Sequence, residues 1–222
     1  MSELELRQEI CRVGKSLFDR GYAHATAGNI SVRLDQELGG GFLITPTDVC
    51  LGFLQPERIA RVDREGRQTS GDRASKTLAL HRRIYDADAA AGCVIHTHSA
   101  NLVALTLSGV WSEADIVPPI TPYYVMKVGH VPLIPYRRPG DPAVGDLVAV
   151  RIEKAQASGR PIRAVMLDRL GPNVWHADLA SAMATLEELE ETARLWLTAN
   201  PKPAPLAEAM LEELRMQFGA HW

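Results

Sequence analysis

The spacing of apolar residues predicts one amphipathic helix followed by several short strands. Four apolar residues near the start recur every three or four positions: Leu6, Ile10, Val13 and Leu17. This spacing predicts a helix over 3–21, which Gly21 ends. Short apolar segments between Gly, Pro and Asp residues then predict strands over 30–34, 42–45 and 58–63.

Helical and extended patterns continue to alternate along the rest of the chain. Helices are expected over 75–86, from about Ser99, and over 141–157, 177–198 and 206–218, with strands over 93–96 and 164–168. Residues 118–142 contain seven prolines, so this segment is expected to form extended edge strands and tight turns. Because the alternation lacks a regular βαβ period, we expect an α/β sandwich with a largely antiparallel sheet.

Length and composition narrow the class of protein. The 222 residues are expected to form one domain, 1–222, that ends in a helical tail over 204–222. With 46% hydrophobic and 23% charged residues, the chain can bury a large core. The formal charge of −3 without a basic cluster argues against a nucleic-acid partner. No apolar segment suits a membrane or a signal peptide, so a cytoplasmic protein is expected.

His96-Thr97-His98 is the sharpest chemical pattern. Side chains at positions i and i+2 of a strand project from the same face, so two imidazoles can converge on one metal ion. The alternative is that both histidines bond to backbone groups at the end of a strand. Two ligands are only part of a metal site.

Three short segments predict anion binding. Gly28 and Asn29 lie at a helix-to-strand turn, where backbone N–H groups can surround an anion. Thr47 follows Pro46 in a second turn, for which an ordinary β-turn is the alternative. Ser75 and Lys76 open an expected helix, whose N-terminus attracts phosphate, although Ser75 could also be a simple helix cap.

Together these segments occur in an order and spacing that resemble the class II aldolase/adducin family over about residues 3–197. The resemblance implies an α/β/α sandwich, a homotetramer with active sites at subunit borders, and a small phosphorylated or acidic sugar-derived substrate. It implies a divalent metal, usually zinc, with manganese or iron as alternatives, bound by His96 and His98. It assigns phosphate contacts to Gly28, Asn29, Thr47, Ser75 and Lys76.

Three further stretches are similar to family decarboxylases that act on phosphorylated 3-oxo sugar acids: residues 118–129, 136–142 and 186–193. They nominate Tyr123 and Arg138 as substrate-contacting, catalytic side chains. For both residues, packing at a subunit interface is the alternative.

Two positions depart from the family pattern. Thr77 occupies the place of a glutamate beside the metal, and Leu170 occupies that of a third metal histidine before Gly171-Pro172. Because catalytic zinc normally has three protein ligands, metal affinity should be reduced unless another group substitutes. His176 is the first candidate for that group, followed by Asp168 and His81; for each, an ordinary polar role is the alternative.

These departures leave three hypotheses for function. Loss of a β-keto acid carboxylate as carbon dioxide needs no initial base, whereas retro-aldol cleavage does, so the missing glutamate favours a metal-dependent decarboxylase over an aldolase. The second hypothesis is a degenerate relative that keeps the fold as a binding or structural protein. The third is a redirected enzyme, such as an aromatic acid decarboxylase or an iron oxygenase.

Overall fold

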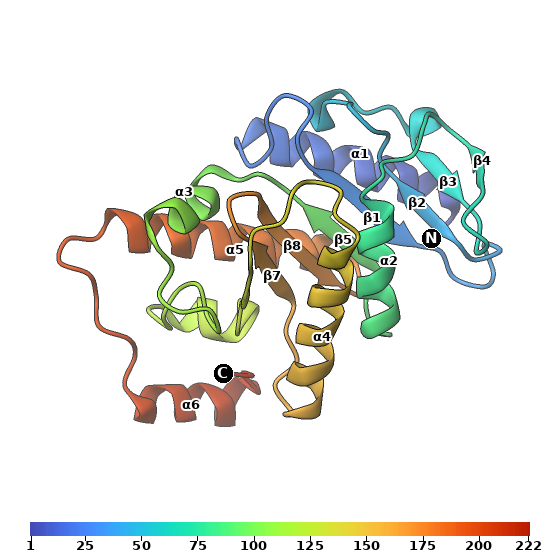
Figure 1. The fold of residues 1–222 in the computed structure, drawn as a ribbon. Coiled ribbons are helices and arrows are strands. Elements are labelled where there is room, and N and C mark those ends of the chain that lie inside the picture. Colours follow the sequence, from blue (N-terminus) through green and yellow to red (C-terminus); the bar gives the residue numbers. More distant parts are fainter.

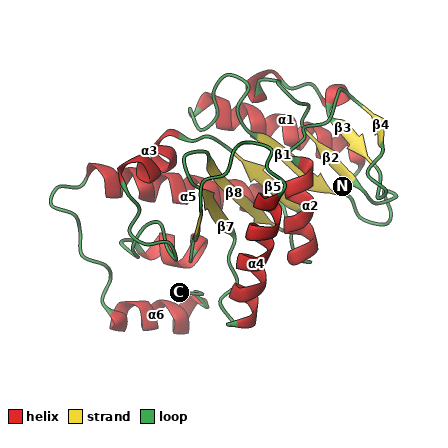
Figure 2. Ribbon diagram, in the orientation of Figure 1, coloured by secondary structure: helices red, strands yellow, loops and turns green.

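One eight-stranded sheet organises the computed structural model, which describes residues 1–222 (Figures 1 and 2). Its strands are β1 (Asn29–Arg33), β2 (Phe42–Ile44), β3 (Ala60–Val62), β4 (Gln68–Ser70), β5 (Cys93–His96), β6 (Leu133–Ile134), β7 (Ala164–Leu167) and β8 (Gly171–His176). Their order across the sheet is β4-β3-β2-β1-β5-β8-β7-β6. Every neighbouring pair is antiparallel except β6 and β7, which confirms the largely antiparallel sheet.

Helices cover both faces of this sheet, so the predicted α/β/α sandwich is confirmed (Figure 1). The helices are α1 (Glu3–Asp19), α2 (Leu78–Ala87), α3 (Ala100–Ser108), α4 (Ala143–Ala157), α5 (Leu179–Thr198) and α6 (Glu208–Phe218). Helices α2 and α4 lie side by side on one face, and α1, α3 and α5 cover the other. Helix α6 lies beyond an extended segment that follows α5 (Figure 1). None of these helices combines the length and apolar character needed to span a bilayer.

Alternating side chains of the central strands fill two separate cores. Ile95 of β5 pairs with Val174 of β8, and both join the cluster under α1, α3 and α5. Val94 and Trp175 form the next pair and face α2 and α4. Because both faces are covered, β5 is an apolar strand that is buried along its whole length.

The starts of two helices show how far local patterns decide the fold. Ser2 caps α1, and its side chain and that of Glu5 form a reciprocal capping box. The α-helix expected over 75–86 begins later, at Leu78, but Ser75 opens the turn that leads into it: its Oγ accepts from the Thr77 N–H at 3.3 Å and its carbonyl from the Leu78 N–H at 3.2 Å. The Ser75 N–H donates to the Thr45 carbonyl at 3.3 Å, which keeps this residue in an extended turn before α2.

Two strands and one turn were not predicted. Strand β4 is polar and fully exposed, so no apolar alternation marks it. Strand β8 follows a tight turn in which Arg169 has a φ of 61°. This turn ends β7 at Leu167, so Asp168 and Leu170 lie in the turn and not on one face of a continuous strand. The proline-rich segment supplies the edge strand β6, as predicted, and also a π-helical turn, η3 (Tyr124–Val128).

Candidate functional site

The end of β5 carries the two neighbouring histidines into the middle of the sheet. His96 is the last strand residue, and it pairs with Asn29 of β1 on one side and Asn173 of β8 on the other. Gly28 and Gly171 lie beside the end of β5, because neighbouring backbone segments approach each other closely there. A Cβ on Gly28 would lie 2.8 Å from the His96 carbonyl oxygen, and one on Gly171 would lie 1.9 Å from that of Thr97.

The two imidazoles are held in a form that can bind a cation. His96 Nδ1 donates to the Pro172 carbonyl at 2.8 Å, so the Nε2 atom of the neutral ring carries the lone pair, which accepts a hydrogen bond from His98 Nε2. His98 Nε2 lies 3.2 Å from that atom, close to the separation of two nitrogens bound to one tetrahedral zinc ion. Burial, with a smaller contribution from His98, lowers the pKa of His96 to about 4. Burial also lowers the pKa of His98, so both rings are neutral at pH 7.

A buried carboxylate fixes the segment that follows His98. Ser99 is the N-cap residue of α3 but its side chain forms no capping hydrogen bond, and Glu190 of α5 reaches the first turn of that helix instead. The Glu190 side chain accepts hydrogen bonds from the backbone N–H groups of Asn101 at 2.9 Å and Leu102 at 3.1 Å. Because the carboxylate occupies the positive end of α3, it ties the strand-to-helix turn that contains His98 to α5.

Most of the predicted site residues line one cavity of about 760 Å³. The cavity lies beside the N-terminal end of α2 and the segment that leads into α4. The predicted residues along it are Gly28, Asn29, Thr47, Ser75, Lys76, His96, His98 and Arg138. The fold therefore brings the two expected metal-binding histidines and the expected phosphate contacts together.

The phosphate side of the cavity offers several unused donors. The backbone N–H groups of Gly28 and Lys76 donate to no group of the chain. The side chains of Lys76, Arg137 and Arg138 have no ion-pair partner, whereas Arg83 in the same wall binds Asp146 at 2.8 Å. An anion would therefore meet free backbone donors and cations without an ion-pair partner, in a cavity that Asp48, Asp141 and Asp168 also line.

Thr77 places a neutral hydroxyl in the cavity, at the position where the family resemblance implies a glutamate. Its Oγ1 accepts a hydrogen bond from Asn29 Nδ2 at 3.3 Å, and it lines the cavity. The Asn29 Oδ1 atom is buried without a partner. A hydroxyl in this position can donate to or accept from a ligand, but it cannot act as a general base at neutral pH.

The third protein ligand remains missing. Leu170 lines the cavity as predicted, and no group of three His, Cys, Asp or Glu side chains lies close enough together to hold a metal ion. His81 does not fill the gap, because it is fully buried, it does not line the cavity, and its Nδ1 bonds to Ser31 Oγ at 2.8 Å. Asp168 does line the cavity.

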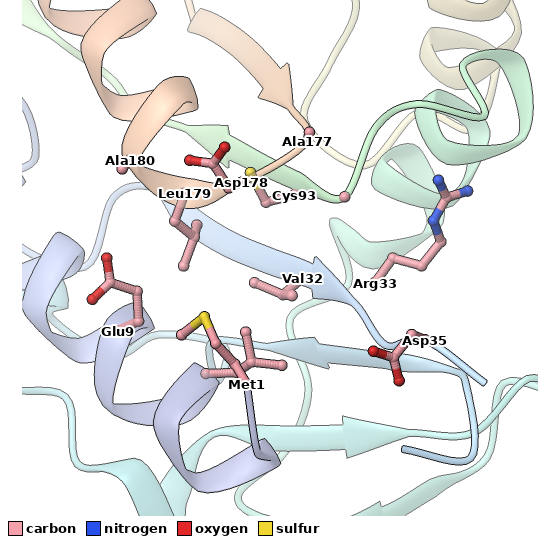
Figure 3. A pocket seen from close by; sticks show the side chains of 12 residues that line it. Met1, Glu9, Val32, Arg33, Asp35, Cys93, Ala177, Asp178, Leu179 and Ala180 are labelled. Atoms are coloured by element: carbon pink, nitrogen blue, oxygen red, sulfur yellow. The ribbon is translucent and has the colours of Figure 1, made fainter. Parts of the chain in front are cut away.

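The proposed ligand role of His176 is wrong, because the strand register places it at the opposite end of β5. His176 pairs with Cys93, whereas His96 pairs with Asn173. Residues beside it line a second hollow of about 350 Å³, shown in Figure 3, where Cys93 lies near Asp178. Burial raises the pKa of the Cys93 thiol to about 12, so this hollow holds no reactive thiolate.

Tyr123 also lies outside the cavity of its own chain. It directly precedes η3, and 61% of its surface is exposed. Sequence reasoning missed Arg137, which lines the cavity beside Arg138, and His24, whose ring lies 6.5 Å from that of His98. Arg137 could have been found from its place in the same proline-rich motif, but no local pattern marks His24.

Comparisons with known proteins identify the family and the fold. Residues 8–197 match the model of the Class II Aldolase and Adducin N-terminal domain. A Cupriavidus necator protein named 3-oxo-tetronate 4-phosphate decarboxylase is 54% identical, with 100% of this chain and 99% of that protein covered. A protein of the same name from Pectobacterium atrosepticum is 41% identical over 87% of this chain and 84% of its own length. The solved structure of YgbL from Escherichia coli is 37% identical, with a TM-score of 0.85 over 96% of this chain and 99% of that one.

Proposed function

Because the chain belongs to the class II aldolase and adducin family, we propose that it is a metal-assisted carbon–carbon lyase. Its reaction is the decarboxylation of a phosphorylated 3-oxo sugar acid, with 3-oxo-tetronate 4-phosphate as the first candidate substrate. The relatives of that name support this substrate class. Zinc is the first candidate for the divalent cation, with manganese and iron as alternatives.

One observation carries the proposal: a single cavity contains neutral, paired imidazoles and a separate set of free anion-binding donors. The imidazoles suit a cation, and the donors suit a phosphate. A phosphorylated 3-oxo acid requires both features, because its ketone at C3 and the phosphate ester on the neighbouring C4 are separate groups that need different partners. A cavity of about 760 Å³ has room for such a substrate.

The reaction requires few catalytic groups from the protein. The bond between C1 and C2 breaks, C1 leaves as carbon dioxide, and the electron pair moves toward the C3 ketone oxygen. A bound divalent cation would stabilise the negative charge that develops on that oxygen. Protonation at C2 then gives a three-carbon hydroxyketone phosphate. Since no base acts before carbon dioxide leaves, Thr77 is compatible with this reaction in a way that it is not with retro-aldol cleavage.

The phosphate end would hold the substrate in place. Asn29, Thr47 and Ser75 offer short polar side chains, and Lys76 adds a positive charge. We place Arg138 on the phosphate as well, because a guanidinium bound to the departing carboxylate would stabilise the ground state more than the transition state. His96 and His98 then define where the ketone must lie.

Tyr123 has a role in this proposal only if subunits associate. It is exposed and does not line the cavity of its own chain that holds His96 and His98, so we propose that it contacts the substrate in a neighbouring subunit of a homotetramer. The resemblance to the family supports that arrangement. Sedimentation velocity of the wild type and of Tyr123→Phe would separate the association of subunits from substrate contact.

The direct test is to mix zinc-loaded protein with 3-oxo-tetronate 4-phosphate that carries ¹³C in its carboxyl group. The expected result is release of labelled carbon dioxide, lost in His96→Ala. The matched control is an aldol substrate such as L-fuculose 1-phosphate, which should give no aldehyde. Aldehyde release without carbon dioxide would contradict the decarboxylase assignment.

A second candidate function follows from the missing third ligand. A degenerate relative that binds phosphorylated compounds without turnover would keep the phosphate end and lose the cation. It predicts that the substrate binds but releases no carbon dioxide at saturating zinc. Calorimetry on the same sample would distinguish this outcome from a protein that binds nothing.

A further inference from the structure

The segment that follows α6 folds back toward the proline-rich segment. Gly219 ends α6 in a left-handed conformation with a φ of 64°, and the Ala220 N–H donates to the Leu214 carbonyl at 3.4 Å. The chain then returns toward η3 (Figure 1), where Trp222 is buried except for 9% of its surface. Arg215 Nε donates to the Trp222 carbonyl at 2.7 Å. Helix α6 therefore holds Trp222 in place through its own C-terminal turn.

Trp222 packs against two rings of the segment that carries Tyr123. Its ring stacks on that of His130, with centroids 4.4 Å apart at 20°, and lies 5.6 Å from that of Tyr124 at 57°. His130 Nδ1 donates to Asp115 Oδ1 at 2.8 Å, which fixes the stacked imidazole. The Tyr124 hydroxyl is buried without a hydrogen-bond partner, so packing alone positions that ring. Trp222 therefore contributes directly to the position of η3.

Helix α5 supports η3 through polar contacts. Thr185 Oγ1 donates to the Lys127 carbonyl at 3.3 Å. Thr121 Oγ1 accepts from the Tyr124 N–H at 3.1 Å and donates to Glu188 Oε1 at 3.5 Å. A five-residue helical turn is not stable alone, because its nucleation is unfavourable. The contacts with α5 and the aromatic stack together fix its backbone.

Tyr123 depends on this support because it directly precedes η3. Its side chain is exposed, whereas that of Tyr124 is fully buried. The buried residue therefore fixes the backbone from which the exposed residue projects.

We propose that Trp222 is a positioning residue for Tyr123, which it orients toward the substrate by holding η3. The proposal rests on the proposed function, because it assumes that Tyr123 contacts the substrate in a neighbouring subunit. It assigns a role to a segment that lies beyond residues 8–197, the part that matches the family model.

The first test measures hydrogen–deuterium exchange of peptides from residues 118–131, on the full chain. Trp222→Leu should raise exchange there and leave α1 unchanged, because η3 opens more often without the stacked ring. Trp222→Phe keeps an aromatic ring and should stay near wild type. Phe218→Leu, at an exposed residue of α6, is the matched control. Unchanged exchange in Trp222→Leu overturns the proposal, and so does a rise spread over the whole chain.

The second test links η3 to the reaction. Trp222→Leu should lower kcat/KM for release of labelled carbon dioxide at least about tenfold, since a displacement of about 1 Å can cost about 10²-fold. Zinc affinity should be unchanged. In a Tyr123→Ala background, Trp222→Leu should cost no further activity, because both changes remove the same contact.

The outcomes separate this proposal from the proposed function. Losses that add in the double variant overturn the link between Trp222 and Tyr123 and leave the lyase proposal intact. A normal kcat/KM in Trp222→Leu has the same meaning. A wild-type chain that releases no carbon dioxide overturns the proposed function, and the exchange of residues 118–131 then decides by itself whether Trp222 holds η3.

Discussion

The two ends of the cavity differ in how complete they are. The phosphate end has free backbone donors at Gly28 and Lys76, together with unpaired cationic side chains. The imidazole end has two well-placed nitrogens, but Thr77 and Leu170 stand where the family resemblance implies a glutamate and a third histidine. The difference indicates that substrate can be held by one end even where the cation is held weakly by the other. Binding and chemistry should therefore respond to different mutations.

The largest effect should come from removing the paired imidazoles. His96→Ala combined with His98→Ala should abolish zinc binding and lower kcat/KM about 10³-fold, because Lewis-acid stabilisation is worth several kcal/mol. Phosphate binding, measured by calorimetry with inorganic phosphate, should be unchanged. His176→Ala is the matched control and should behave as wild type. Equal loss of phosphate binding in the double variant would show that the two ends are not separate.

Restoring the residues that the family resemblance implies should increase the zinc affinity of the imidazole end. Thr77→Glu together with Leu170→His should raise zinc affinity by about 10–100-fold, the range over which supporting groups tune metal sites. Leu170→Asn is the control, since an amide of similar size is a poor zinc ligand. Unchanged zinc affinity in the double variant would mean that positions 77 and 170 do not face the cation.

Lowering the pH should destabilise the fold, because His81 and His96 are buried in their neutral form. Burial, with a contribution from His96, lowers the pKa of His81 to about 3. A lowered pKa means that the unfolded chain binds protons first, so stability is full above about pH 6.5 and falls as the pH decreases toward the folded pKa. At about pH 5, each of these two histidines should lower the free energy of unfolding by about 2 kcal/mol.

Urea denaturation at several pH values would measure this effect. His81→Gln should flatten the pH dependence by about half, whereas His221→Asn, a change in an exposed residue, should not alter it. An unchanged slope in His81→Gln would contradict the buried, neutral state of His81.

The smallest expected effect belongs to a single residue of the phosphate end. Lys76→Ala should raise KM for the phosphorylated substrate about tenfold, as expected for one charge-assisted hydrogen bond, with kcat nearly unchanged. Lys154→Ala, on the exposed surface of α4, is the matched control. A fall in kcat with constant KM would place Lys76 at the reacting centre instead.

The sequence predicted the layers of the fold and most of the cavity, because both depend on local patterns. Short apolar strands marked the sheet, and His96 and His98 were expected on one side of a strand end. The incorrect assignment of His176 as a metal ligand has a different cause. The hairpin before β8 turns at Arg169, a non-glycine residue with a positive φ, and the Gly171-Pro172 pair that marks its end was interpreted only through the family resemblance. Without that turn, the register that sends His176 to the far end of β5 was not predictable.

Long-range contacts explain the remaining differences. His24 is an isolated histidine in a turn, and only the packing of that turn on the end of β5 brings it near His98. Tyr123 was expected in the site, but its position relative to the cavity depends on how the proline-rich segment folds. Such placements are set by tertiary structure rather than by spacing along the chain.

The two glycines that flank the end of β5 limit how this enzyme scaffold can be redesigned. A combinatorial library aimed at new substrates would naturally vary the residues around the two histidines. At Gly28 and Gly171, however, a Cβ atom would collide with a backbone carbonyl oxygen, that of His96 at 2.8 Å and that of Thr97 at 1.9 Å. A library that keeps both positions fixed, and diversifies the side chains facing the open volume, will retain far more folded members.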